Sequence, residues 1–295
     1  MEKLFRFAMK NSRWAGAGVA LLFFALSGMF DIPAVLRWVP TALVLAILNR
    51  HLVGQYWAMV YLRLKHGSRL PSKENYVCEG DYILPFAGKW SVYDGGVTKE
   101  LSIAWGEMSQ RYAYCFLIFD DDGNVNDGRD SSVESYHCYG KDVLAAAAGV
   151  VVKASGKHAD SRTDGMKVYC DTWDVRGNHV VIRHNDNEFS YVGHLMPGSV
   201  AVKVGDRVKQ GDVIAKCGNS GYTAEPHLHF QLQSSKSFTM SAGLPIAFAN
   251  VKARDSVGYG AWHGKAGADC PSTKGNLELA GGKTYIGRGL DVENE

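Results

Sequence analysis

The sequence predicts an all-β domain, a compact antiparallel sandwich or barrel, preceded by membrane helices at the N-terminus. Apolar segments lie within residues 1–70, whereas from Pro71 onward short runs of β-forming residues alternate with glycine-rich turns. No long amphipathic helical pattern appears after Pro71. With 295 residues, 46% hydrophobic and 21% charged, the chain can hold one sizeable globular domain plus something smaller.

The first apolar segment, residues 14–30, carries no charge and follows Lys10 and Arg13. Its length is close to the lower limit for a helix that spans a bilayer. A signal peptide is the alternative, because the basic start, the apolar centre and the small residues Ala25 and Ser27 on either side of Leu26 fit that plan as well. The second apolar segment, residues 34–48, would hold the cleaved product in the membrane. We therefore expect a membrane protein.

The side of the membrane depends on the number of spans. Lysines and arginines greatly outnumber acidic residues in residues 1–66. A two-helix hairpin would put both basic flanks in the cytoplasm, as such flanks prefer, and would leave the large C-terminal domain there. A single span would export that domain. Residues 51–70 mix aromatic and basic side chains, which suits an interfacial helix or a plain helical linker.

We divide the chain into a membrane anchor at residues 1–70, a β domain at residues 71–233 and a C-terminal extension at residues 234–295. The strands expected in the β domain are residues 82–86, 90–93, 111–119, 149–154, 179–184, 189–194 and 227–232. The formal net charge of +2 and the lack of a long basic run argue against a nucleic-acid partner.

The pair His227 and His229 is the main candidate for chemistry. Residues two apart on a strand project to the same face, so both imidazoles would point at one place. That geometry suits a metal ligand beside a catalytic partner, and a tight turn at residues 218–221 leads into it. A solvated strand face that happens to carry two histidines is the alternative for the pair taken alone.

A series of segments in order along the chain resembles the lysostaphin-type (LytM) zinc endopeptidases, which cut peptide cross-bridges in peptidoglycan. The segments are residues 141–151, 177–182, 191–195, 204–214, 218–221 and 226–230. The similarity covers roughly residues 82–232. It implies an antiparallel sheet of the duplicated hybrid motif type that forms an open groove, with one zinc held by a histidine, an aspartate and a second histidine.

Carried over residue by residue, the resemblance implies that His229 binds zinc and that His227 and His194 are the catalytic histidines. These roles agree with general chemistry. Zinc takes imidazole nitrogen, lowers the pKa of its bound water and polarises the scissile carbonyl, while a nearby imidazole can move the proton.

The remaining ligands depart from the family pattern. The strand that matches the first motif, residues 110–116, places Cys115 at the position of the aspartate, and no histidine lies between His66 and His137. A thiolate is a good zinc ligand, but Cys115 and His229 are only two protein ligands where a catalytic site normally has three.

The spacing supports no third ligand among His137, Cys138 and His158. The sequence therefore predicts an incomplete zinc site and leaves two functions open. The first is a zinc endopeptidase that acts on peptidoglycan peptides. The second is an inactive relative that binds cell-wall peptide or regulates another wall hydrolase.

The cysteine count bears on whether the β domain lies in an oxidising or a reducing compartment. Six cysteines permit three disulfides in an exported domain, although their pairing cannot be read from the sequence, whereas a reducing compartment would keep all six as thiols. A disulfide at Cys115 would prevent it from binding zinc. The N-terminal segments predict that the membrane is one partner, and the resemblance implies peptidoglycan peptide as the other. We therefore expect a bacterial cell membrane protein whose β domain lies outside the cytoplasm.

Overall fold

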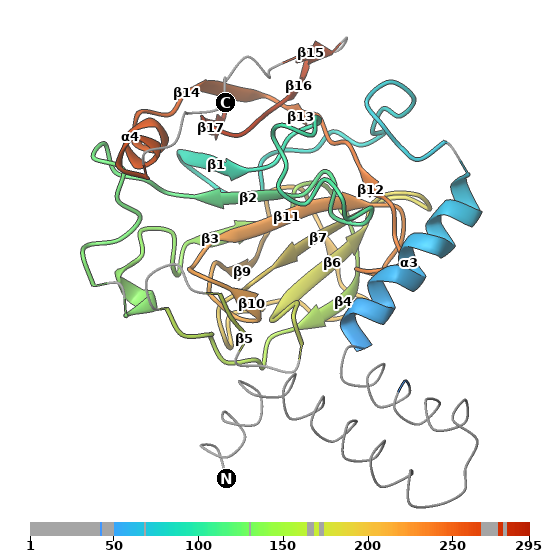
Figure 1. Cartoon of the computed structure of the whole chain (residues 1–295), viewed down its shortest axis with the longest axis horizontal. Helices are drawn as coiled ribbons and strands as arrows, with labels where there is room; N and C mark the ends of the chain where they lie inside the picture. Colours follow the sequence, from blue (N-terminus) through green and yellow to red (C-terminus); the bar gives the residue numbers. More distant parts are fainter. Residues whose placement is uncertain are drawn as a thin grey trace, which may run out of the picture. The chain divides into compact units, whose positions relative to one another are not determined.

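The structure is a computed structural model that describes residues 42, 50–67, 69–129, 131–163, 168–170, 174–266, 277–279 and 282–295 (Figure 1). The chain divides into two compact units, Met1–Tyr61 and Leu62–Glu295. The expected membrane segments at residues 14–30 and 34–48 lie outside the described residues, apart from residue 42. Among the residues that are described, no helix has both the length and the apolar character needed to cross a bilayer.

The elements follow one another in this order. They are α3 (Arg50–His66), β1 (Trp90–Asp94), β2 (Tyr114–Leu117), the 3-10 helix η1 (Val133–Ser135), β3 (Asp142–Leu144), β4 (Gly149–Ser155), β5 (Tyr169–Cys170), β6 (His179–Arg183), β7 (Phe189–Gly193), β8 (Arg207–Val208), β9 (Val213–Lys216), β10 (Tyr222–Thr223), β11 (Leu228–Gln233), β12 (Gly243–Leu244), β13 (Phe248–Ala249), β14 (Val251–Asp255), α4 (Val257–Ala266), β15 (Leu277–Leu279), β16 (Lys283–Tyr285) and β17 (Leu290–Asn294).

One antiparallel sheet of ten strands organises the second unit. Its order is β14-β17-β1-β2-β11-β7-β6-β4-β8, with β12 paired to β11, and Figure 1 shows β2, β11, β7, β6 and β4 side by side. Every residue of β7 and of β11 is buried, so both faces of these central strands are covered. The prediction of a mainly antiparallel β architecture is confirmed for the described residues.

Several strand boundaries differ from the expectation. Residues 82–86 form no strand, and Tyr82 makes only an isolated bridge to Phe248. The backbone of this segment bonds instead to scattered partners, such as the Asn294 side chain, which accepts from the Leu84 amide at 2.9 Å. Pro85 also lacks the amide hydrogen that a sheet ladder needs. The strand expected at residues 111–119 is shorter and spans Tyr114–Leu117.

Helix α4 is an element that the sequence pattern did not indicate. Its start is stabilised by Ser256, whose hydroxyl accepts a hydrogen bond from the Tyr259 amide at 3.2 Å. Gly258 lies so close to the Asp120 carbonyl that a Cβ atom would sit 2.3 Å from that oxygen. Tyr259 and Trp262 then pack their rings on Phe119. Packing against Phe119 and Asp120 therefore stabilises this helix, although its glycines give it a weak intrinsic helix propensity.

The residues after 233 add strands to the same sheet, because β14 pairs with β17 and β17 pairs with β1. Side chains reinforce this junction. Arg288 lies 3.0 Å from the buried Asp94 carboxylate, and the Ser91 hydroxyl donates to Asp291 at 2.5 Å. The expected boundary between the β domain and the C-terminal extension at residue 233 stays a prediction.

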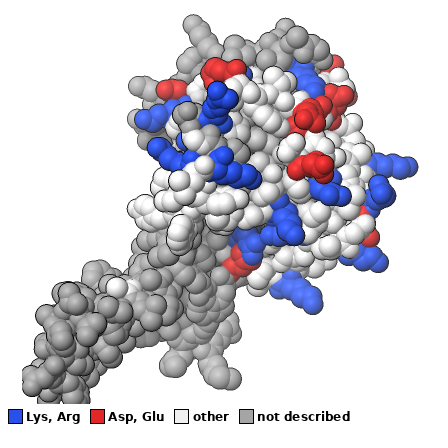
Figure 2. All heavy atoms as spheres, turned by 90° about the vertical axis from the view of Figure 1, so that its right-hand side faces the viewer, with Lys and Arg blue, Asp and Glu red and all other residues white. Residues whose placement is uncertain are grey.

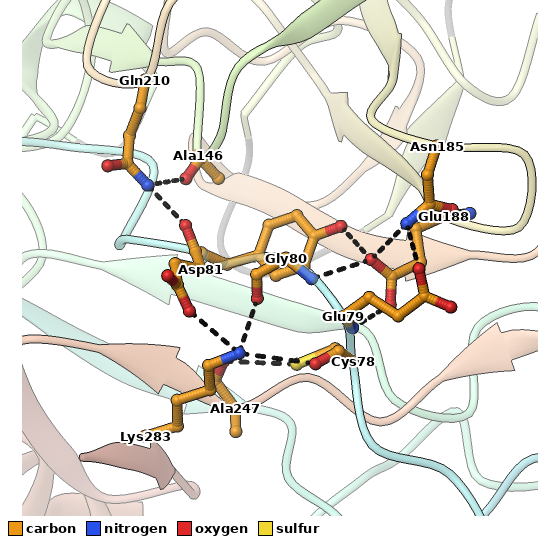
Figure 3. Close-up of polar contacts among 11 residues, drawn as sticks. Cys78, Glu79, Gly80, Asp81, Ala146, Asn185, Glu188, Gln210, Ala247 and Lys283 are labelled. Atoms are coloured by element: carbon orange, nitrogen blue, oxygen red, sulfur yellow. Dashed lines mark hydrogen bonds and ion pairs between the residues drawn. The ribbon is translucent and has the colours of Figure 1, made fainter. Parts of the chain in front are cut away.

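The buried carboxylate of Glu188 attaches the segment before β1 to the sheet. It accepts hydrogen bonds from the Tyr76 hydroxyl at 2.5 Å and the Tyr82 hydroxyl at 2.7 Å. It also accepts from the amides of Glu79 and Gly80 at 2.6 and 3.1 Å (Figure 3). Burial alone would raise the pKa of this carboxyl, but the hydrogen bonds outweigh burial and hold its pKa below the ordinary value.

Charged side chains are mixed on the face drawn in Figure 2. Lysines and arginines lie among uncharged residues and among aspartates and glutamates, without forming one continuous positive stripe. The expectation that the chain binds no nucleic acid stays a prediction.

Candidate functional site

Neighbouring strands bring the predicted site residues together. His229 on β11 is in register with Cys115 on β2 and with Gly193 on β7. Side chains in register on adjacent strands project to the same face of a sheet. His194 directly follows Gly193, and His227 directly precedes β11. The four residues named from the sequence therefore lie around one site.

The histidine rings are close to one another and largely buried. The ring of His194 has its centroid 4.7 Å from that of His227 and 5.8 Å from that of His229. His194 and His229 are 9% and 7% exposed, while His227 is half-buried. The Cys115 sulfur lies 4.0 Å from Nδ1 of His229.

Backbone carbonyls fix the orientation of two of these rings. Nδ1 of His194 lies 2.8 Å from the Ser220 carbonyl oxygen, and Nδ1 of His227 lies 2.9 Å from that of Glu225. A carbonyl only accepts, so in each ring Nδ1 carries the hydrogen and Nε2 keeps its lone pair. His194 holds its position with a φ of 58°, an uncommon conformation for a residue other than glycine. Both rings are thus proton acceptors at Nε2.

His229 has the opposite arrangement, which depends on Gln231. Nε2 of His229 lies 3.0 Å from the Gln231 side-chain oxygen. The Gln231 side-chain nitrogen donates to the Gln233 side-chain oxygen at 2.7 Å and to the Ser109 carbonyl at 3.2 Å, and these bonds fix the direction of its amide. Nε2 of His229 is therefore the donor, and its Nδ1 lone pair faces the Cys115 sulfur. Sequence reasoning missed Gln231, although its position two residues after His229 places it on the same strand face.

Burial keeps the three imidazoles neutral. It lowers the pKa of His229 to about 4, in spite of the opposing hydrogen bond to Gln231. Burial also lowers the pKa of His227, and together with the neighbouring histidines it lowers that of His194 well below the ordinary value. Burial, and then the charge of Asp94, raise the pKa of the Cys115 thiol. Without a metal, Cys115 is protonated and the histidines are uncharged.

The arrangement fits part of a zinc site only. On one tetrahedral zinc, a thiolate sulfur and an imidazole nitrogen would be about 3.6 Å apart, close to the 4.0 Å between Cys115 and His229. Within the described part of the chain, however, no three histidine, cysteine, aspartate or glutamate side chains form a group that could hold a metal. Asp94, in register with Cys115, is instead bonded to Arg288 and to the Ile103 amide. The described residues supply no third protein ligand beside Cys115 and His229.

The other candidate ligands have different partners or positions. The Cys138 thiol donates to the Pro226 carbonyl at 3.1 Å, and neither His137 nor His158 belongs to a metal-binding group of described residues.

Aromatic rings form one wall of the site. The ring of Tyr191 lies 5.7 Å from that of His229 and 4.7 Å from that of Phe238, and Phe238 in turn lies 6.2 Å from His229. His179 stacks on the other side of Tyr191 at 5.5 Å. Alternation along β7 indicates Tyr191, which lies two residues before Gly193, whereas no local pattern indicates Phe238 in the loop after β11.

The turn at residues 218–221 holds the backbone around His194 in place. The Ser220 hydroxyl donates to the Leu195 carbonyl at 2.8 Å, and the Asn178 amide donates to that hydroxyl at 2.8 Å. Gly221 has a φ of +92°, and a Cβ atom there would lie 2.5 Å from the Gly177 nitrogen. The expected tight turn thus packs against a second backbone segment, which leaves no space for a side chain at Gly221.

Comparison with known proteins identifies the segment that holds the histidines. Residues 129–240 match the model of peptidase family M23. This range contains His194, His227 and His229, whereas Cys115 precedes it.

Similar proteins include cell-wall enzymes. The glycyl-glycine endopeptidase ALE-1 of Staphylococcus capitis is 30% identical over 137 residues, which are 46% of this chain and 32% of that protein. Endolysin 2638A of Staphylococcus phage 2638A is 38% identical over 95 residues, 31% of this chain and 16% of that protein. Peptidoglycan DD-endopeptidase ShyA of Vibrio cholerae is 34% identical over 86 residues, 28% of this chain and 20% of that protein. The chain thus spans less than a third of the length of these relatives.

Among solved structures, the catalytic domain of lysostaphin from Staphylococcus simulans aligns with a TM-score of 0.31 and 25% identity. The alignment covers 53% of this chain and 88% of that domain. Because the score is low, the family assignment rests on the sequence matches.

Proposed function

We propose that this chain, whose residues 129–240 form a peptidase family M23 domain, is a membrane-anchored protein that acts on the cross-bridge peptides of peptidoglycan with an incomplete zinc site. The observation that carries the proposal is the convergence of His194, His227 and His229 on one face of the sheet inside the matched segment. The printed names of the relatives, a glycyl-glycine endopeptidase and a peptidoglycan DD-endopeptidase, support this class of substrate.

The site residues suit a peptide backbone. The Nε2 lone pairs of His194 and His227 can accept hydrogen bonds from peptide amides or from a water molecule, because both rings are neutral and hold their hydrogen on Nδ1. The half-buried ring of Phe238, packed on Tyr191 and beside His229, adds apolar surface to the site. A neutral imidazole next to a bound peptide can take a proton from an attacking water, which is the role expected for His194 and His227.

The alternative function is a catalytically inactive relative that binds wall peptide or regulates another wall hydrolase. It is favoured by the ligand shortage around Cys115 and His229 and by the pairing of Asp94 with Arg288. A bound zinc would polarise the scissile carbonyl and acidify a water, and a site with two ligands holds it weakly.

Digestion and binding assays separate the two functions. We expect the purified full chain to bind peptidoglycan fragments that carry intact cross-bridges and to bind them less after His194→Ala or His227→Ala. Release of new amino termini from glycyl or D-amino-acid peptides, lost in both variants, would identify a peptidase. Binding without any release would identify the inactive relative, and lack of binding in the native chain would contradict both.

The membrane location is part of the same proposal. We propose that residues 1–70 anchor the chain in a bacterial cell membrane and that the β domain faces the outside, where peptidoglycan lies. A protease added to intact spheroplasts should then digest the β domain while a cytoplasmic marker protein stays whole. Protection of the β domain until the membrane is lysed would contradict this orientation.

A further inference from the structure

Two buried thiols lie side by side near the histidine site without a role in it. Cys138 and Cys217 are 1% and 0% exposed and belong to the same hydrophobic core. Their thiols lie close enough to interact, and the Cys138 thiol donates to the Pro226 carbonyl at 3.1 Å. Pro226 directly precedes His227. The two thiols are not bonded to each other in the structure.

The backbone explains why residues 79 positions apart meet. The Gly140 amide donates to the Cys217 carbonyl, and the Cys217 amide donates to the Lys141 carbonyl, both at 2.8 Å. The Lys141 amide bonds back to the Cys138 carbonyl at 3.2 Å, closing a turn in which Gly140 has a φ of +73°. A glycine in this left-handed conformation suits the third position of such a turn. The turn folds Cys138 back over Cys217.

The other described thiols have different surroundings. Cys78 donates to the Ala247 carbonyl at 3.6 Å, and Cys115 faces His229. Among the cysteines whose side chains are described, Cys138 and Cys217 are therefore the two whose thiols are neighbours.

We propose that Cys138 and Cys217 form a disulfide when the chain meets a disulfide oxidant such as glutathione disulfide. This bond clamps the turn at residues 138–141 to the turn at residues 218–221, which supports His194. In the reaction, the two thiols lose two protons and two electrons and an S–S bond forms between them. The oxidant takes up both electrons as its own S–S bond breaks, giving two molecules of reduced glutathione.

The bond would act on the site from two sides. Cys217 is followed by Gly218, whose amide donates to the His194 carbonyl at 3.1 Å, and by Ser220, whose carbonyl holds the His194 ring. Oxidation fixes this end of the chain to the turn at Cys138. It also removes the thiol hydrogen that Cys138 donates to Pro226, beside His227. The disulfide would close a loop that contains His194, and closing a long loop restricts the unfolded chain.

Peptide mapping of the full chain tests the proposal. The chain is equilibrated in a glutathione redox buffer with urea below its unfolding transition, so that local opening exposes the thiols. It is then quenched with acid, alkylated, digested and analysed by mass spectrometry. The urea concentration is chosen in a parallel experiment with iodoacetamide. It is raised until both Cys138 and Cys217 are alkylated, which shows that reagents in the buffer reach both thiols.

We expect a peptide linked through Cys138 and Cys217 as the main oxidised product, and an unfolding midpoint raised by about 10 °C relative to the reduced chain. The same peptide should form in Cys78→Ser and be absent from Cys217→Ser. Glutathione adducts on the two thiols, or a different pairing as the main product, would overturn the proposed bond. An unfolding midpoint that is unchanged or lower in the linked chain would overturn the clamp.

Discussion

Gln231 decides which nitrogen of His229 faces Cys115. Its oxygen accepts from Nε2 of His229, and its own amide is held by Gln233 and the Ser109 carbonyl. Gln231 is a positioning residue, since it acts on the site through His229. An amide is neutral, so its hydrogen bond favours the imidazolium of His229 less than a carboxylate would.

A carboxylate at residue 231 should change the protonation of His229. In Gln231→Glu we expect the pKa of His229 to rise from about 4 toward the ordinary histidine value, because a negative charge beside Nε2 stabilises the imidazolium. Histidine-selective NMR titration of the chelator-treated chain measures this shift. Gln233→Glu serves as the control, because residue 233 lies one hydrogen bond further from the ring. It should raise the pKa of His229 less. Equal pKa values for His229 in the native chain and in Gln231→Glu would contradict the assigned orientation.

Glu188 should contribute to stability in a pH-dependent way. Its folded-state pKa is lowered, so its contribution is fully present above the unfolded pKa of about 4.3 and is lost as the pH falls through the folded value. We expect Glu188→Gln to lower the free energy of unfolding by about 3 kcal/mol at pH 7, because charged acceptors make the stronger hydrogen bonds.

Urea unfolding at pH 7 and at pH 3 measures both the loss and its pH dependence. The difference between the native chain and Glu188→Gln should shrink at pH 3, because the unfolded carboxyl takes up a proton below its pKa of about 4.3 and the stabilising contribution declines. Glu79→Gln is the matched control, because its exposed carboxylate accepts only from the Asn185 side chain at 3.1 Å. A difference that is the same at both pH values would show that the charge of Glu188 has no part in it.

The turn at residues 218–221 requires glycine for two separable reasons, conformation and space. Gly221→Ala should lower the free energy of unfolding by about 3 kcal/mol or more, since the new Cβ would meet the Gly177 backbone at 2.5 Å as well as adopt a positive φ.

Gly205→Ala separates these effects, because Gly205 has a φ of +99° but nothing within 4 Å of the added Cβ. We expect a loss of only about 1 kcal/mol there, from the backbone conformation alone. Chemical unfolding of both variants gives the comparison. Similar losses in the two variants would mean that the contact with Gly177 yields at little cost.

Sequence pattern predicted the central strands better than the irregular segments. The stretches at residues 90–93, 149–154, 179–184, 189–194 and 227–232 each contain most of a strand of the sheet. Residues 82–86 look like a strand because they are apolar, but their backbone bonds to isolated partners. Helix α4 escaped prediction because its glycines lower its helix propensity, and Gly258 among them serves close packing.

The site was partly predictable for a related reason. Alternation along a strand places His227 and His229 on one face, and the family resemblance adds His194. Register between strands far apart in sequence brings Cys115 opposite His229 and Asp94 opposite Cys115. No local pattern contains that register. The hydrogen bonds of Gln231 depend on it as well, because they involve Ser109 from a distant segment.

The C-terminal strands complete the sheet that carries the site. β17 pairs with β1, which pairs with β2, the strand of Cys115, while β12 pairs with β11 directly. We expect a chain that ends at residue 233 to lose cooperative unfolding, because β1 would become an unprotected edge and the Asp94 carboxylate would lose Arg288.

Thermal unfolding monitored by circular dichroism, with the full chain alongside, checks this expectation. A chain ending at residue 287 is an informative comparison, since it lacks Arg288 and β17 but keeps β12 and β14. A chain ending at residue 233 that unfolds cooperatively at the temperature of the full chain would show that residues 71–233 fold independently of the extension.

The incomplete zinc site is the central claim about the molecule as a whole. Cys115 and His229 approach each other as two ligands would, but the described residues supply no third. Metal analysis of the purified full chain after dialysis against zinc tests this most directly, with Cys115→Ala and Cys115→Asp measured beside it. We predict well under one zinc per native chain, and a higher content in Cys115→Asp. One tightly held zinc per native chain, lost in Cys115→Ala and in His229→Ala, would contradict the account.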